Sequence, residues 1–126
     1  MSGTKLLFDS NIIIYLSKKL LDARAFTKIE DVPCISVITY MEVMGYRFKY
    51  KSEKEFIENF CTIAHLIELD KSIVTRVVKL RSENNIKLPD AIIAATALEA
   101  NMTLITHNAS DFKGISGLNL LDPLKK

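Results

Sequence analysis

Short apolar segments alternate with longer helical patterns along this chain, and that alternation limits the possible folds more than any other feature. Strands separated by helices usually pair in parallel within one sheet, with helices on both of its faces. We therefore expect an α/β fold, a three-layer α/β/α sandwich with a central, mostly parallel sheet, in a single domain spanning residues 1–126. The expected strands are Lys5–Phe8, Pro33–Ser36, His65–Leu69, Thr103–Thr106 and Gly117–Leu121.

The helices are predicted from the spacing of apolar residues and from capping residues. Ser52 and Glu55 form a capping-box pattern, and residues 91–100 are apolar nearly all round, which predicts a buried helix. The segment Val37–Tyr50 follows a helical pattern, although its tail also alternates with the period of a strand. The expected helices are Asn11–Leu21, a short one at Leu21–Ile29, Val37–Tyr50, and three that begin near Ser52, Asp70 and Leu88.

Composition excludes several classes of protein. Nearly half of the 126 residues are hydrophobic, enough for a core without disulfides. The cysteines Cys34 and Cys61 are far apart and only two histidines are present, so a zinc site is not expected. No signal-peptide pattern and no apolar run of roughly 18–20 residues occurs, which predicts a cytoplasmic protein with no membrane span. The net charge of +2 neither indicates nor excludes nucleic-acid binding.

Two acidic residues lie in the first half of the chain at positions that suggest chemistry. Asp9 follows the first expected strand, where the alternative interpretation is a helix N-cap. Glu42 is one helical turn from Ile38 and from Tyr46, on or beside the apolar stripe. Because an unpaired buried carboxylate is costly, Glu42 is expected to have a metal or a basic partner. The alternative is that Glu42 lies at the helix margin and reaches solvent.

Two further acidic residues lie in the second half. Asp90 opens the buried helix, where an acid also complements the helix dipole. Asp111 lies in the loop that leaves the strand ending at Thr106, and the alternative there is an ordinary solvated acid. Ligands in parallel sheets bind beyond the carboxyl ends of the strands, so all four acids are expected at one edge of the sheet.

Carboxylates gathered at one edge repel one another unless a divalent cation is bound. Oxygen ligands without histidine select Mg²⁺ or Mn²⁺ over zinc. Such a site suits phosphodiester hydrolysis, in which the metal polarises the phosphate and activates a water molecule. No G-x-S-x-G, P-loop or G-x-G-x-x-G pattern is present to indicate other chemistry.

Three segments together resemble a known family: LLFDSNIIIYL at Leu6–Leu16, ISVITYMEVMGY at Ile35–Tyr46, and KLPDAIIAATALEANMTLITHNASDFKGISGL at Lys87–Leu118. They are similar to the PIN domain, and specifically to the VapC-type toxin nucleases. The resemblance covers nearly the whole chain in the order and spacing of the family. It implies a PIN-like sandwich and the Mg²⁺- or Mn²⁺-dependent endoribonuclease of a type II toxin–antitoxin pair.

The resemblance also implies roles for particular residues. It carries the acidic positions of the family onto Asp9, Glu42, Asp90 and Asp111, with Asp9 and Asp90 as the firmest metal ligands. Asp111 completes the site, directly or through water, and Glu42 binds a second metal or orients the attacking water. The implied partners are an RNA substrate such as tRNA, a cognate antitoxin and a second copy in a homodimer. The supporting polar positions are Asn11, Thr106 and Asn108.

Other residues have less defined roles. Arg81 and Lys113 are the preferred candidates for contacts to RNA phosphates. The aromatic residues of Tyr46–Tyr50 are expected in the core or against a partner, with stacking on unpaired bases as the alternative. His107 is interpreted as a loop residue, because a metal-activated water needs no histidine. The alternative functions are a catalytically inert PIN-like module that binds RNA or protein and a Mg²⁺-dependent phosphatase or receiver.

Overall fold

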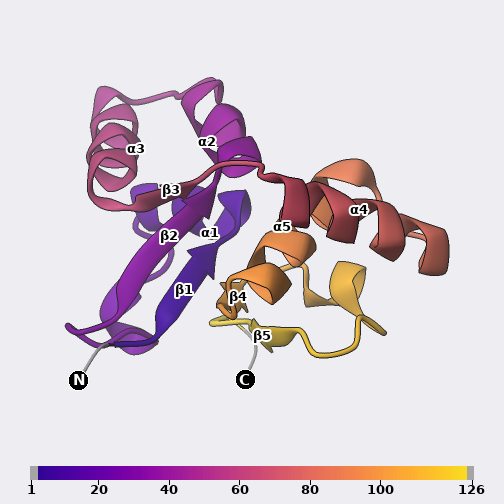
Figure 1. The fold of residues 1–126 in the computed structure, drawn as a ribbon. Helices are drawn as coiled ribbons and strands as arrows, with labels where there is room; N and C mark the ends of the chain where they lie inside the picture. The colour runs from indigo at the N-terminus through magenta and orange to yellow at the C-terminus, as the bar shows by residue number, and fades with distance from the viewer. Residues whose placement is uncertain (1–2, 125–126) are drawn as a thin grey trace.

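A parallel sheet of five strands forms the centre of the computed structural model, which describes residues 3–124 (Figure 1). The strand order is β3-β2-β1-β4-β5, and every neighbouring pair is parallel. β1 lies in the middle, so the residue that follows it is flanked by the ends of β2 and β4. The strands are β1 (Lys5–Phe8), β2 (Val32–Ser36), β3 (His65–Ile67), β4 (Thr103–Ile105) and β5 (Asn119–Leu121).

Helices cover both faces of the sheet, as predicted for an α/β/α sandwich. Leu7, Cys34 and Leu104 of the sheet pack against α4 and α5 on one face. Ile35 and Ile105 pack against α1 and α3 on the other face, together with Val43 of α2. The helices are α1 (Ser10–Ser17), α2 (Val37–Met44), α3 (Lys51–Ile63), α4 (Lys71–Glu83) and α5 (Leu88–Glu99), with short 3-10 turns at η1 (Ala23–Ala25) and η2 (Ala109–Phe112).

The predicted starts of α4 and α5 are confirmed. The Asp70 carboxylate caps α4 by accepting a hydrogen bond from the Ile73 N–H at 2.9 Å. Residues 91–97 of α5 are all buried, as their apolar composition predicted. Asn101 then adopts a positive φ of 54°, a conformation that asparagine tolerates, and this ends the helix before β4.

The helix predicted for Val37–Tyr50 is wrong beyond Met44. Gly45 caps the helix there, with its N–H donating to the Met41 carbonyl at 3.1 Å. The next residues form neither the predicted helix nor a strand, and α3 begins at Lys51 with no side-chain cap on its N-terminus. The capping box predicted at Ser52 is therefore also wrong. This irregular stretch places Tyr46 beside the site described below.

Two other boundaries differ from the sequence prediction. The helix expected at Leu21–Ile29 shortens to the turn η1, which Asp22 caps through the Arg24 N–H at 3.0 Å. α1 ends at Ser17, and Lys19 beyond it has a positive φ of 59°. Within residues 3–124, no helix has the length and apolar character needed to cross a membrane.

Candidate functional site

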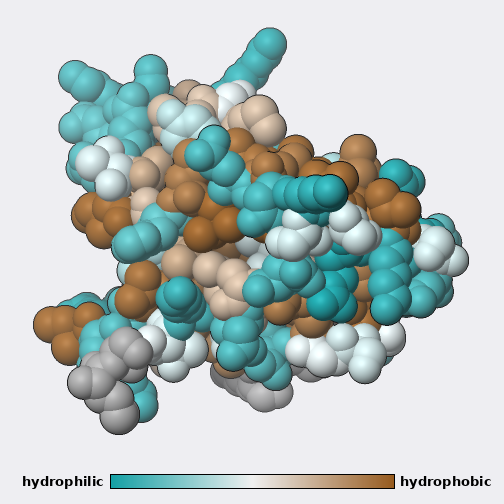
Figure 2. Space-filling model, in the orientation of Figure 1, coloured by the Kyte–Doolittle hydropathy of each residue, from teal (hydrophilic) through white to brown (hydrophobic). Residues whose placement is uncertain are grey.

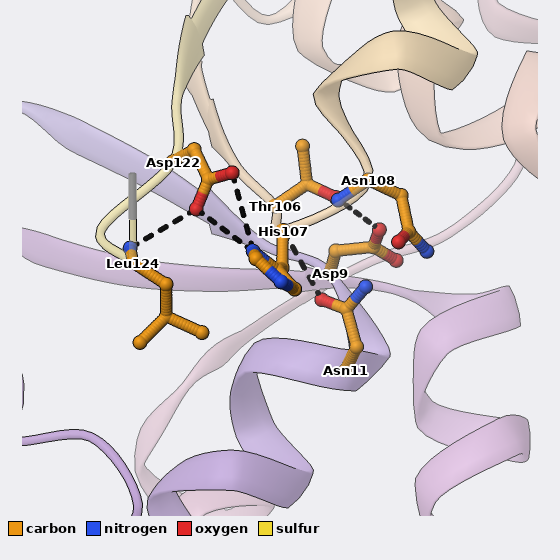
Figure 3. A network of polar contacts seen from close by, with 7 residues as sticks. All are labelled: Asp9, Asn11, Thr106, His107, Asn108, Asp122 and Leu124. Atoms are coloured by element: carbon orange, nitrogen blue, oxygen red, sulfur yellow. Dashed lines mark hydrogen bonds and ion pairs between the residues drawn. The ribbon is translucent and has the colours of Figure 1, made fainter. Parts of the chain in front are cut away.

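The Asp9 carboxylate is buried where β1 meets α1. One oxygen, Oδ1, accepts a hydrogen bond from the Ser10 N–H at 2.8 Å, which caps α1. The other, Oδ2, accepts from the Thr106 hydroxyl at 2.7 Å. Thr106 Oγ1 in turn accepts from the Asn108 N–H at 3.0 Å (Figure 3). Asp9 is thus an N-cap, as the alternative interpretation held, and it also joins the first strand to the loop after β4.

The surroundings of Asp9 oppose its negative charge. Burial is the main cause that raises its pKa, and the charges of Glu42 and Asp111 raise it further. The hydrogen bonds from Thr106 and Ser10 act in the opposite direction, since they stabilise the ionised form. The net result is a raised pKa, so the carboxylate gains from any cation that comes close to it.

Glu42 lies on the solvent-exposed side of α2, so the prediction that it is buried beside the apolar stripe is wrong. α2 buries Thr39 and Val43, so Glu42 lies outside the face that packs against the core. The exposed position still faces the site, because the Ser10 hydroxyl donates to Glu42 Oε1 at 2.6 Å. This contact joins the start of α1 to α2 directly beside Asp9.

The other two predicted acids, Asp90 and Asp111, lie on α5 and η2. Asp90 is half-buried in the first turn of α5, and its pKa is raised by burial and by the charges of Asp111, Asp9 and Glu42. The cation of Lys87, the N-cap of α5, acts against this shift. Asp111 is exposed on η2, which the buried Phe112 ring anchors to the core.

A cavity of about 370 Å³ lies between these groups. Its lining includes Asp9, Glu42 and Asp90 together with the predicted supporting residues Asn11 and Asn108. Asp111 is not among the lining residues, although its charge acts on both Asp9 and Asp90. Three of the four predicted acids therefore line one hollow beyond the end of β1, and the fourth lies within electrostatic reach.

A family model described as the PIN domain matches residues 6–118. This chain belongs to the PIN domain family. A chain of a toxin-antitoxin complex from Klebsiella pneumoniae is 38% identical, with a TM-score of 0.75, and the match covers 96% of this chain and 99% of that one. A chain of VapBC-1 from nontypeable Haemophilus influenzae is 28% identical, with a TM-score of 0.76, over 97% and 100% of the two chains.

A chain of DNA-bound VapBC from Salmonella typhimurium has the same fold, with a TM-score of 0.78 and 22% identity over 95% of this chain and 98% of that one. A comparison with curated proteins finds no match. The PIN domain described here therefore shares its fold with chains of several toxin-antitoxin complexes.

Sequence reasoning missed two contacts around the cavity of this PIN domain. The first is the hydrogen bond that the Ser10 hydroxyl donates to Glu42. His107 is a loop residue, as predicted, but its Nδ1 pairs with the Asp122 carboxylate at 3.1 Å, as Figure 3 shows. Only the position of Ser10 directly after Asp9 could have indicated its role. The pairing of His107 with Asp122 depends on where β5 ends, which no local pattern reveals.

The cations predicted to contact RNA lie outside the cavity lining. Arg81 is in the last turn of α4 and Lys113 follows η2, and both are exposed. Neither lines the carboxylate cavity, so their contacts with RNA stay a prediction. Lys87 differs from both, because its charge lowers the pKa of Asp90 and therefore acts on a carboxylate of the site.

Proposed function

We propose that this PIN domain is a Mg²⁺- or Mn²⁺-dependent endoribonuclease and the VapC-type toxin of a type II toxin–antitoxin pair. The observation that carries the proposal is the convergence of Asp9, Glu42 and Asp90 on one cavity, where the charges of Glu42 and Asp111 raise the pKa of both Asp9 and Asp90. Negative charges gathered around buried carboxylates destabilise the ionised forms of those carboxylates, so this convergence is best explained by a bound cation.

The donor groups fit a hard divalent cation. All four are carboxylates, and the polar side chains of Asn11 and Asn108 beside them add only oxygen and amide nitrogen. Among residues 3–124, no three histidine, cysteine or acidic side chains are close enough together to hold one ion as they stand. Binding therefore requires side-chain rotation, and the exposed Asp111 has the freedom for it.

Each residue has a distinct part in the proposed hydrolysis. Asp9 and Asp90 would hold the cation, with Asp111 completing the site directly or through water. Thr106 favours the ionised form of Asp9, because its hydrogen bond lowers the pKa of that carboxyl. When bound, the cation neutralises the carboxylates, polarises the phosphodiester and acidifies a water molecule. Glu42, fixed by Ser10 through one carboxylate oxygen, orients the attacking water with the other.

The proposed partners are a cognate antitoxin and a second copy of the chain. In support, apolar side chains form a band across the face seen in Figure 2, interrupted by hydrophilic residues. Exposed apolar residues gathered on one face are typical of protein-interaction sites. Exposed apolar residues on α2, on β3 and after it, and on α4 include Met41, Met44, Leu66, Leu69 and Val74.

The test is cleavage of end-labelled RNA by the purified chain. We expect cleavage in Mg²⁺ or Mn²⁺, none in EDTA, and none of DNA of the same sequence. Asp9→Asn and Asp90→Asn should each lose at least a hundredfold in rate, because each removes a ligand charge. Glu58→Gln is the matched control, since Glu58 is an exposed acid on α3 away from the cavity.

Each contrary result has a clear meaning. Unchanged cleavage in both aspartate variants would remove the basis for the proposed site. Metal binding without cleavage of any RNA would contradict the nuclease and favour an inert binding module. Cleavage that persists in EDTA would contradict the metal dependence.

A further inference from the structure

Two tyrosines line the same cavity as the carboxylates. Tyr15 reaches it from α1 and Tyr46 from the irregular stretch that follows α2. Tyr46 is 41% exposed, well above the level of a core aromatic residue. The other aromatic side chains of this stretch differ: Phe48 is half-buried against the α1 and α3 core, and Tyr50 is outside the cavity. The exposure of Tyr46 therefore rules out a core role and leaves a partner or an RNA base as its contact.

The Tyr46 ring is supported from within the protein. The Lys18 ammonium lies over the ring, 5.7 Å from its centroid, and Phe48 packs against it at a centroid distance of 4.9 Å. Lys18 is itself held by a 3.1 Å ion pair with the buried Glu53 of α3. A cation over an aromatic ring is attracted by its π electrons. The ring is thus held in place by its neighbours while much of its surface remains open to solvent.

The Tyr15 ring is supported from a different part of the chain. It packs edge-on against the imidazole of His107, with the centroids 5.9 Å apart and the planes at 65°. That imidazole pairs with the Asp122 carboxylate beyond β5. The backbone N–H of His107 donates to Asn11 Oδ1 at 3.5 Å (Figure 3). The loop that carries Thr106 and Asn108 therefore also supports an aromatic side chain of the cavity.

The charge of the cavity makes uncharged contacts important. Asp9, Glu42 and Asp90 line it, and RNA phosphates are also anions, so the protein alone repels the backbone at this point. Lys18, the cation that lies over the Tyr46 ring, is already paired with Glu53. Stacking of bases on aromatic rings does not depend on charge and is tolerant of sequence. Stacking therefore provides binding energy for RNA where charge attraction to its phosphates is absent.

We propose that Tyr15 and Tyr46 are base-stacking residues that determine which RNA the site accepts. The inference rests on the proposed ribonuclease function and deepens it. A base stacks on a side chain only after it has left its neighbours in the helix. The site therefore selects RNA whose nucleotides beside the cut are unpaired, and it discriminates against duplex of the same sequence.

The experiment separates RNA binding from cleavage. In a non-cleaving Asp90→Asn background with Mg²⁺, we would titrate ten-nucleotide single-stranded RNAs that carry the fluorescent base 2-aminopurine at successive positions. Stacking on tyrosine quenches this fluorescence. We expect quenching at two positions, one for each ring, and Tyr46→Leu should abolish it at one of them and weaken binding about tenfold. Tyr46→Phe keeps the ring and should retain both signals, while Tyr50→Leu is the control for an exposed tyrosine outside the cavity.

The catalytic chain gives a second readout. With Asp90 intact, Tyr46→Leu should raise the KM for single-stranded RNA more than it lowers kcat, because stacking forms before the chemical step. The proposal is overturned if Tyr46→Leu binds and quenches like the parent, or if duplex RNA binds as tightly as single-stranded RNA. It is also overturned if Tyr46→Leu weakens only antitoxin binding. Failure of the wild type to cut any RNA counts instead against the ribonuclease function itself.

Discussion

Replacing Thr106 with valine tests how the fold stabilises the ionised form of the Asp9 carboxylate. The Thr106 hydroxyl is fully buried, donates to Asp9 Oδ2 at 2.7 Å and accepts from the Asn108 N–H at 3.0 Å. Valine has a similar shape but makes neither bond. A hydrogen bond to a charged group contributes about 1.5–3 kcal/mol, so we expect Thr106→Val to lower the free energy of unfolding by about 2–3 kcal/mol near neutral pH.

The loss should depend on pH. Burial raises the pKa of Asp9 in the folded state above its ordinary value of 3.8, and the Thr106 bond limits that rise. Because the folded pKa is the higher one, the folded protein binds this proton more tightly. The stability that this proton contributes is present below the unfolded pKa and is lost as pH rises through the folded pKa. Removing the hydroxyl raises the Asp9 pKa further, so the deficit of Thr106→Val should grow from acidic to neutral pH.

Urea unfolding of wild type and Thr106→Val in EDTA, at a series of pH values, measures this deficit. Thr106→Ser is the control, because serine keeps the hydroxyl and loses only a methyl group. We expect Thr106→Ser to follow the pH dependence of wild type. Equal stability of Thr106→Val and wild type at every pH would refute the reasoning, and so would a pH-independent deficit shared by both variants.

Three further substitutions test the supports of the site. Phe112→Ala removes a buried ring beneath Asp111 and should cost about 3–5 kcal/mol by urea unfolding; a loss under about 1 kcal/mol would contradict this anchoring role. Lys18→Met leaves the buried Glu53 carboxylate unpaired and should cost about 1–2 kcal/mol, which a thermal melt detects and which Glu53→Gln in the same chain should partly restore. Asp122→Ala frees the His107 imidazole and should slow RNA cleavage several-fold at unchanged Mn²⁺ affinity, and a loss of Mn²⁺ binding instead would contradict the role assigned to this pair.

The elements that local patterns describe well could be predicted from the sequence. The strand Lys5–Phe8 and the buried helix after Pro89 depend on short-range apolar composition and capping, and both are found where expected. The exposure of Glu42 was only the alternative interpretation, because the apolar residues around it placed it on or beside the buried stripe, whereas α2 buries Thr39 and Val43. Helical periodicity alone does not show which side of a short helix packs against the core.

The acidic residues of the site could be predicted from the sequence, but the side chains that contact them could not. Asp9 and Asp90 stand at element ends, where the rule for parallel sheets places ligands. The hydrogen bond from Ser10 to Glu42 and the pairing of His107 with Asp122 connect elements that are far apart in the chain. Such contacts depend on the packing of α1 against α2 and on the path after β5, which no single segment encodes.

A calorimetric titration with Mn²⁺ tests the central claim most directly. If the four carboxylates form one cation site, wild type should bind Mn²⁺ with measurable heat, and Asp9→Asn and Asp90→Asn should each bind at least tenfold more weakly. Glu58→Gln should bind like wild type, because Glu58 is outside the cavity. Equal affinity in wild type and both aspartate variants would contradict the account.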